Sequence, residues 1–87
     1  MKFQFFSDPG HGWVKVKRTL IEKLGLTNKI THFSYVRNEH VYLEEDMDLA
    51  TFMKAMKEVG KTIEFKEHHT NKTSRIRNYD HYGLAVN

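Results

Sequence analysis

The 87-residue chain is long enough for one domain with a single two-layer core, and its content of 39% hydrophobic and 13% aromatic residues excludes disorder over most of its length. It has no cysteine, which excludes a disulfide framework and a thiolate metal site and permits a reducing compartment. No stretch has the length of an apolar membrane span, and residues 1–10 lack a secretory leader pattern. We therefore expect a cytoplasmic protein that does not bind membranes.

The net charge of +3 conceals a segregation of charge along the chain. Residues 1–38 carry seven Lys or Arg against two acids, residues 39–67 carry eight acids against four Lys, and residues 68–87 carry three basic residues against one acid. This pattern predicts separate basic and acidic faces rather than a uniformly basic nucleic-acid binder.

The first third of the chain is typical of a β-hairpin followed by a short helix. Residues 2–7 form an aromatic run that ends at the turn-forming sequence Asp-Pro-Gly of residues 8–10, which predicts a strand entering a turn. Residues 13–17 (WVKVK) alternate, so the two valines should face one side of a second strand and the tryptophan and lysines the other. Residues 18–24 have helical spacing, and Gly25 stands where a left-handed C-terminal cap is expected.

The middle of the chain predicts a second hairpin and a longer helix. Residues 30–36 and 40–44 read as two strands joined at Asn38, which tolerates a positive φ. Asp48 is the expected N-cap of a helix whose apolar residues follow the 3.6-residue period until Gly60. Residues 62–66 alternate as a last core strand.

The element order ββαββαβ predicts an α+β fold, a two-layer sandwich of an antiparallel or mixed sheet with two helices on one face. If residues 13–17 instead joined the first helix, the order would become the ferredoxin-like βαββαβ. We assign residues 1–70 to one domain and residues 71–87 to a polar, basic tail, either docked or partly disordered, with a short strand or arm at residues 75–77.

The stretch SDPGHGW, residues 7–13, has two interpretations. Its glycines and amides could hold an anion, with His11 and Trp13 stacking on a base or supplying a proton. The alternative, which we favour, is a structural hairpin corner in which the tryptophan covers apolar sheet surface. The spacing fits neither the Walker loop nor the dinucleotide fingerprint.

An acidic run lies at the expected junction between a strand and the longer helix. Glu44, Glu45, Asp46 and Asp48 could hold Mg²⁺, present a contact patch to a basic partner, or complement the positive end of the helix. The run lacks EF-hand spacing, so we expect no metal. The acidic contact patch stays a candidate.

The six histidines and the polar side chains predict neither a metal centre nor a catalytic set. His68 and His69, adjacent on a strand, would point to opposite faces and could not easily share one ion. His11 and Asp8 are close in sequence, but neighbours on a tight turn rarely reach the geometry of a triad. We expect no cofactor and no catalytic residue, with a small enzyme centred on these two residues as the least favoured hypothesis.

The tail interleaves arginines and tyrosines. Arg75 and Arg77 could grip phosphate while Tyr79 or Tyr82 stacks on bases, which is typical of a nucleic-acid or nucleotide contact. The same residue types dominate protein interface hot spots. A third possibility is that the tail folds back onto the first hairpin.

Three motifs together, SDPGHGW at residues 7–13, VYLEED at residues 41–46 and SRIRNYD at residues 74–80, carry a resemblance. Over nearly its whole length the chain is similar to a family of small uncharacterised proteins from bacteriophages and related mobile elements. That family has no established activity, so the resemblance supplies no site residue. It implies a phage accessory factor that binds a host defence complex or host enzyme.

Two functional hypotheses follow. The first is a phage-encoded counter-defence or host-takeover protein that inhibits a host protein or protein complex through a protein interface, in the host cytoplasm. Its acidic contact patch would be Glu44, Glu45, Asp46 and Asp48, and its aromatic and basic contacts would be His11, Trp13, Lys15, Lys17, Arg75, Arg77 and Tyr79. The alternative is a nucleic-acid or nucleotide-binding module that uses the basic hairpin, including Arg18, and the Arg/Tyr tail.

Overall fold

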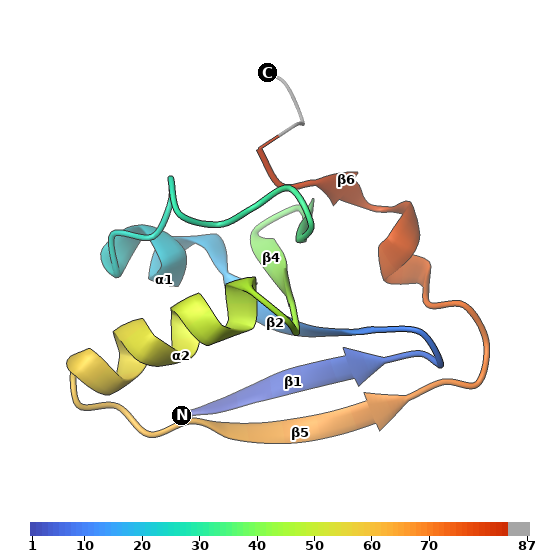
Figure 1. The fold of residues 1–87 in the computed structure, drawn as a ribbon, viewed down its shortest axis with the longest axis horizontal. Coiled ribbons are helices and arrows are strands. Elements are labelled where there is room, and N and C mark those ends of the chain that lie inside the picture. The colour runs from blue at the N-terminus through green and yellow to red at the C-terminus, as the bar shows by residue number, and fades with distance from the viewer. Residues whose placement is uncertain (84–87) are drawn as a thin grey trace.

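The protein forms a six-stranded mixed β-sheet with two α-helices, so the predicted α+β fold is confirmed (Figure 1). The computed structural model describes residues 1–83. The strands are β1 (Lys2–Ser7), β2 (Gly12–Lys17), β3 (Tyr35–Arg37), β4 (His40–Glu44), β5 (Glu64–His69) and β6 (Asp80–His81). The helices are α1 (Arg18–Lys23), α2 (Asp48–Glu58) and the short 3₁₀ helix η1 (Arg75–Asn78). None of the helices within residues 1–83 is long and apolar enough to cross a membrane.

The strand order in the sheet is β5-β1-β2-β4-β3-β6. Every neighbouring pair is antiparallel except β1 and β5, which run parallel side by side in Figure 1. The segment that is consistent with two readings, residues 13–17, is strand β2 and not part of α1. The core therefore follows the ββαββαβ order, with β6 added at the far edge.

One face of the sheet, the helix face, carries the main core. The valines of β2 and alternate apolar residues of its neighbours pack here against both α-helices, as the two-residue period of the strands requires. The fully buried members are Val14, Val16, Val41, Leu43, Ile21, Phe52 and Met56. Phe3 meets the ring of Phe52 edge-on, with centroids 5.3 Å apart.

The alternate side chains of each strand lie on the opposite face of the sheet, here called the open face. Cross-strand pairing places Lys15 beside Gln4 and Tyr42, and Lys17 beside His40. No α-helix of the described residues covers this face. Part of it is covered instead by η1, whose Ile76 packs with Trp13 and Tyr42 in a second, smaller core.

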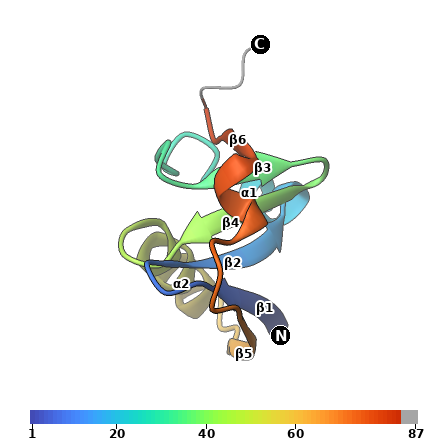
Figure 2. The same ribbon diagram turned by 90° about the vertical axis from the view of Figure 1, so that its right-hand side faces the viewer.

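The segment after β5 crosses from one edge of the sheet to the other. Figure 2 shows it rising from β5 through η1 to β6, which pairs with β3. The expected strand or arm at residues 75–77 is wrong, because the chain there closes a 3₁₀ turn in which Ser74 Oγ accepts the N–H of Ile76. Residues 71–83 lie against the sheet, and the remainder of the predicted tail, residues 84–87, lies outside the described residues.

Two local expectations in the middle of the chain are wrong for one reason. Residues 30–34 form turns rather than the start of a strand, because Thr31 and Ser34 donate hydrogen bonds to the carboxylate of Asp48. Since that carboxylate is engaged away from its own helix, Asp48 is not the N-cap of α2. Glu44 takes over the role, accepting the N–H groups of Asp46, Met47 and Asp48.

Candidate functional site

The three sequence motifs, separated along the chain, meet at one corner of the molecule. Asp8 of the first motif and Arg77 of the third form a bidentate ion pair, with Nε–Oδ2 and Nη2–Oδ1 distances of 2.7 and 2.9 Å. The guanidinium of Arg77 lies over the ring of Trp13, 5.1 Å from its centre. His11 of the first motif faces Glu44 and Glu45 of the second.

Asp8 organises the loop between β1 and β2. Its carboxylate accepts the N–H groups of Gly10 and His11 within the loop and of Ser74 across it. The hydrogen bonds from Arg77, and then the backbone donors, hold the pKa of this carboxyl well below its usual range despite the opposing effect of burial. The SDPGHGW stretch is therefore a hairpin corner locked to η1.

Two residues proposed as free contact anchors have internal partners. Trp13 is 1% exposed, because Arg77 and Ile76 cover its ring, so as an exposed anchor it was predicted wrongly. Arg77 is partly exposed, but the ion pair with Asp8 occupies its guanidinium and raises its pKa. Sequence alone did not reveal this pairing because the two residues are 69 positions apart.

The acidic run is divided between the interior and the surface. Glu44 is 2% exposed and Asp48 1%, since the first caps α2 and the second binds the residue 30–34 turns. As members of an exposed contact patch both were predicted wrongly. Glu45 and Asp46 remain exposed.

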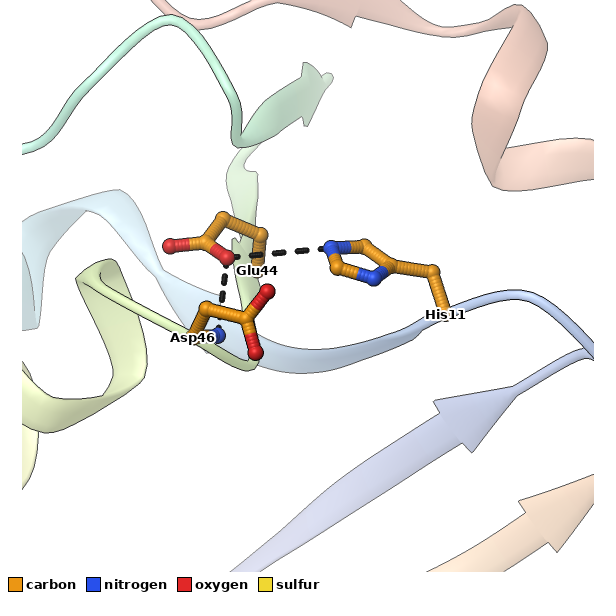
Figure 3. Close-up of side chains that lie close together, drawn as sticks. All are labelled: His11, Glu44 and Asp46. Atoms are coloured by element: carbon orange, nitrogen blue, oxygen red, sulfur yellow. Dashed lines mark hydrogen bonds and ion pairs between the residues drawn. The ribbon is translucent and has the colours of Figure 1, made fainter.

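His11 lies in a hollow at this corner that Glu44, Asp46 and Arg77 also line. Its Nε2 is 3.7 Å from Glu44 Oε2 and its Nδ1 is 3.3 Å from Glu45 Oε2. Figure 3 shows Asp46 beside His11 and Glu44, with its backbone N–H donated to Glu44. The hollow has a volume of about 370 Å³ and is also lined by the aromatic ring of Tyr35.

The open face presents a second candidate site, which is basic. Two hollows of about 440 and 500 Å³ share Lys15 of this face, and the first also extends to α1 and to Phe3 at the end of the sheet. No aspartate or glutamate of residues 1–83 lines either hollow. The first hollow is lined by Met1, Lys2, Phe3, Gln4, Lys15, Lys17, Thr19, Leu20, Lys23 and His40. The second is lined by Phe6, Ser7, Lys15, Tyr42, His68, His69, Thr70, Lys72, Thr73, Ser74, Arg75, Ile76 and Tyr79.

The pKa of His40 is sensitive to this concentration of positive charge. His40 pairs across strands with Lys17 and lies on the same face as Lys15. Burial is the main cause of its lowered pKa, and the charge of Lys15 lowers it further against the weaker opposing effect of Glu39. Of the charges around His40, Lys15 therefore has the largest effect on its pKa, followed by Glu39 and then Lys17.

Aromatic rings accompany the lysines. Phe6 and His68, cross-strand partners on β1 and β5, stack with centroids 4.9 Å apart and planes at 17°. Both line the larger hollow and are half-buried, and His68 Nε2 has no hydrogen-bond partner in the part of the chain that the structure describes. Tyr79 packs on Tyr42 and lies under the guanidinium of Arg37, 4.9 Å from it.

Only some of the basic and aromatic residues predicted from sequence to bind a partner lie on the open face. The open face brings together Lys15, Lys17, Arg75 and Tyr79. Arg18 and Tyr82 instead donate hydrogen bonds to the backbone carbonyls of Asn38 and Thr27. The prediction missed Lys2, Lys66, Lys72, Phe6 and His68 as members of the same surface. The alternation of residues 2–7 and 64–68 is the signal that could have found most of them.

Comparison with known proteins adds no relative. No family model matches the chain, and neither the curated proteins nor the solved structures include a significant match. The resemblance to small phage proteins therefore stays a prediction.

Proposed function

We propose that this protein binds single-stranded nucleic acid along the open face of its sheet. The observation that carries the proposal is the pair of hollows that share Lys15 and have no carboxylate among their described lining residues. A chain of phosphates needs a continuous positive track rather than one isolated cation, since each neutralised phosphate adds to affinity by releasing counterions. Two adjoining hollows suit an extended strand better than one mononucleotide.

The cations stand at positions that match such a track. Lys2 and Lys17 line the smaller hollow, Lys72 and Arg75 line the larger one, and Lys15 lies between. Lys17, Lys72 and Arg75 are exposed, so their charges are available to phosphate. The hydroxyl groups along the larger hollow provide neutral donors to phosphate oxygens, as is common in nucleic-acid interfaces.

The aromatic rings supply the second element of recognition. A half-buried ring on a sheet face offers a π-surface to an unpaired base, and base stacking contributes about 1–3 kcal/mol per base. Phe6 and His68 stack on each other and line the larger hollow, where a base would stack on the outer face of either ring. A duplex hides its base faces, so these rings favour a single strand.

The hypothesis of a counter-defence protein that binds a host protein stays a prediction. The burial of Glu44, Asp48 and Trp13 removes three of the contacts on which it relied, and leaves Glu45 and Asp46 as its acidic surface. A phage origin and a cytoplasmic location are compatible with either function.

The test compares two double variants that remove the same charge from opposite faces. Lys15→Gln/Lys17→Gln alters the open face, and Lys54→Gln/Lys57→Gln alters exposed positions on α2. Binding to a fluorescein-labelled 12-nucleotide strand of mixed sequence is measured by anisotropy as a function of salt.

We expect the open-face variant to bind about 25-fold more weakly at 0.1 M salt, because each lysine that no longer neutralises a phosphate takes about 0.7 from the slope of log K against log salt. The α2 variant should stay within about twofold of the parent, since charge on that side has no phosphate to contact. Equal weakening by both variants, or no binding by the parent at low salt, would contradict the proposal.

A further inference from the structure

We infer that His11, Glu44 and Asp46 form a binding site for one divalent cation of the first transition row, with Zn²⁺ the best-fitting ion. Each residue offers one ligand atom, and the three atoms lie within 4.8 Å of one another. Ligands on a tetrahedral ion at about 2.0–2.2 Å stand roughly 3.4 Å apart, so small side-chain movements would close the site. An imidazole with carboxylates suits Zn²⁺ better than Mg²⁺ or Ca²⁺, which prefer oxygen alone.

Glu44 is a preorganised ligand. Its side chain is 3% exposed and its two oxygens accept three backbone N–H groups at the start of α2. These bonds hold the carboxylate rigidly in place. Oε2 accepts only one of them, and a second lone pair is left on the side of His11.

Glu45 is placed to give the outer support that a metal-bound imidazole usually has. Glu45 Oε2 lies 3.3 Å from His11 Nδ1, while His11 Nε2 faces the Glu44 carboxylate (Figure 3). A carboxylate on one ring nitrogen fixes the tautomer that leaves the other nitrogen free to coordinate. The two glutamates therefore take different roles around one ring.

The local charge also calls for a cation. Three carboxylates, those of Glu44, Glu45 and Asp46, gather around a single imidazole, and within residues 1–83 no lysine or arginine lies within ion-pair distance of them. A neutral imidazole adds no charge, so a bound divalent ion would neutralise most of the excess. Arg77 also lines the hollow, but its guanidinium is paired with Asp8.

A separate observation points to a further group in the same hollow. Trp13 is 1% exposed and lines it, and the indole N–H has no acceptor among the described residues. Buried indole N–H groups usually have a partner. A water or anion that completes the coordination of a metal in this hollow would provide an acceptor, which the three protein ligands leave room for.

The test is a calorimetric titration of the untagged full chain with ZnCl₂, with far-UV circular dichroism to verify folding of each variant. We expect one Zn²⁺ per chain in the parent. His11→Gln and Asp46→Asn should each weaken binding by at least about tenfold, and Glu45→Gln by about tenfold, because it holds the ring without coordinating. Glu44 is left intact because it caps α2.

The control is His68→Gln/His69→Gln, which removes two adjacent imidazoles of β5 that lie outside the hollow. It should bind Zn²⁺ like the parent. Co²⁺ provides an independent readout. The visible absorption of Co²⁺ bound to the parent should indicate a nitrogen ligand, and this absorption should be lost in the folded His11→Gln variant. Unchanged affinity in that variant, loss of binding in the control, or no binding by the parent would overturn the inference.

Discussion

Breaking the ion pair between Asp8 and Arg77 should cost a large share of the stability of this small domain. Arg77→Ala leaves the Asp8 carboxylate, 2% exposed, with only three backbone N–H donors among the described residues. Removing one partner of a buried pair costs about 3–5 kcal/mol. Because the Arg77 side chain is 37% exposed, water can enter where it was, so we expect the lower end, about 3 kcal/mol.

A double-mutant cycle separates the pair from its surroundings. Asp8→Ala frees a guanidinium that can turn to water but removes the loop hydrogen bonds of Gly10 and His11, for an expected cost of about 2.5 kcal/mol. If the coupling is about 2 kcal/mol, the double variant should lose about 3.5 kcal/mol rather than the sum of the two. Urea unfolding followed by the fluorescence of Trp13 and by circular dichroism measures each value.

The pH dependence of the stability of the same variants tests whether the negative charge of Asp8 contributes to the ion pair. The folded-state pKa of Asp8 lies below its unfolded value of about 3.9, so the stabilisation is fully present above that value and is lost as the pH falls through the folded pKa. Between pH 5 and pH 2.5 the parent should therefore lose more stability than Asp8→Ala does. A coupling below about 0.5 kcal/mol, or parallel pH profiles, would show that the ion pair does not stabilise the fold.

Two further predictions concern packing and charge. Gly12→Ala should destabilise by about 2–3 kcal/mol, because an added Cβ would lie 2.6 Å from the ring of Phe5. Gly25→Ala, in open space at φ +71°, should cost only about 1 kcal/mol in the same urea assay, and equal costs would contradict the steric argument. The lowered pKa of His40 makes stability fall as the pH drops through the unfolded value of about 6.5. An NMR titration of its ring protons should give a pKa below 6.5 that rises in Lys15→Gln, and an unshifted pKa would contradict this.

The elements and the two faces of the sheet were predictable because they rest on local patterns. The alternation of residues 13–17 sorted Val14 and Val16 from Lys15 and Lys17, and the structure keeps that division. The positive φ of Asn38 likewise follows from its own turn chemistry. Such signals lie within a few residues of one another.

The candidate sites were harder to predict because they depend on contacts between distant segments. Asp48 has the sequence of an N-cap, but the turns at Thr31 and Ser34 compete for its carboxylate and win. The arginines of the tail looked equivalent, yet Arg77 pairs with Asp8 while Arg75 stays exposed beside the larger hollow. No property of the tail alone distinguishes them.

The most direct test of the proposed function is an NMR titration of the ¹⁵N-labelled protein with an unlabelled single-stranded oligonucleotide at low salt. Binding on the open face should concentrate the amide shifts on β1, β2 and β5 and near η1, around Lys15, and should leave α2 unaffected. Shifts confined to α2 or to the corner of Glu45 and Asp46, or no shifts at all, would contradict binding on the open face.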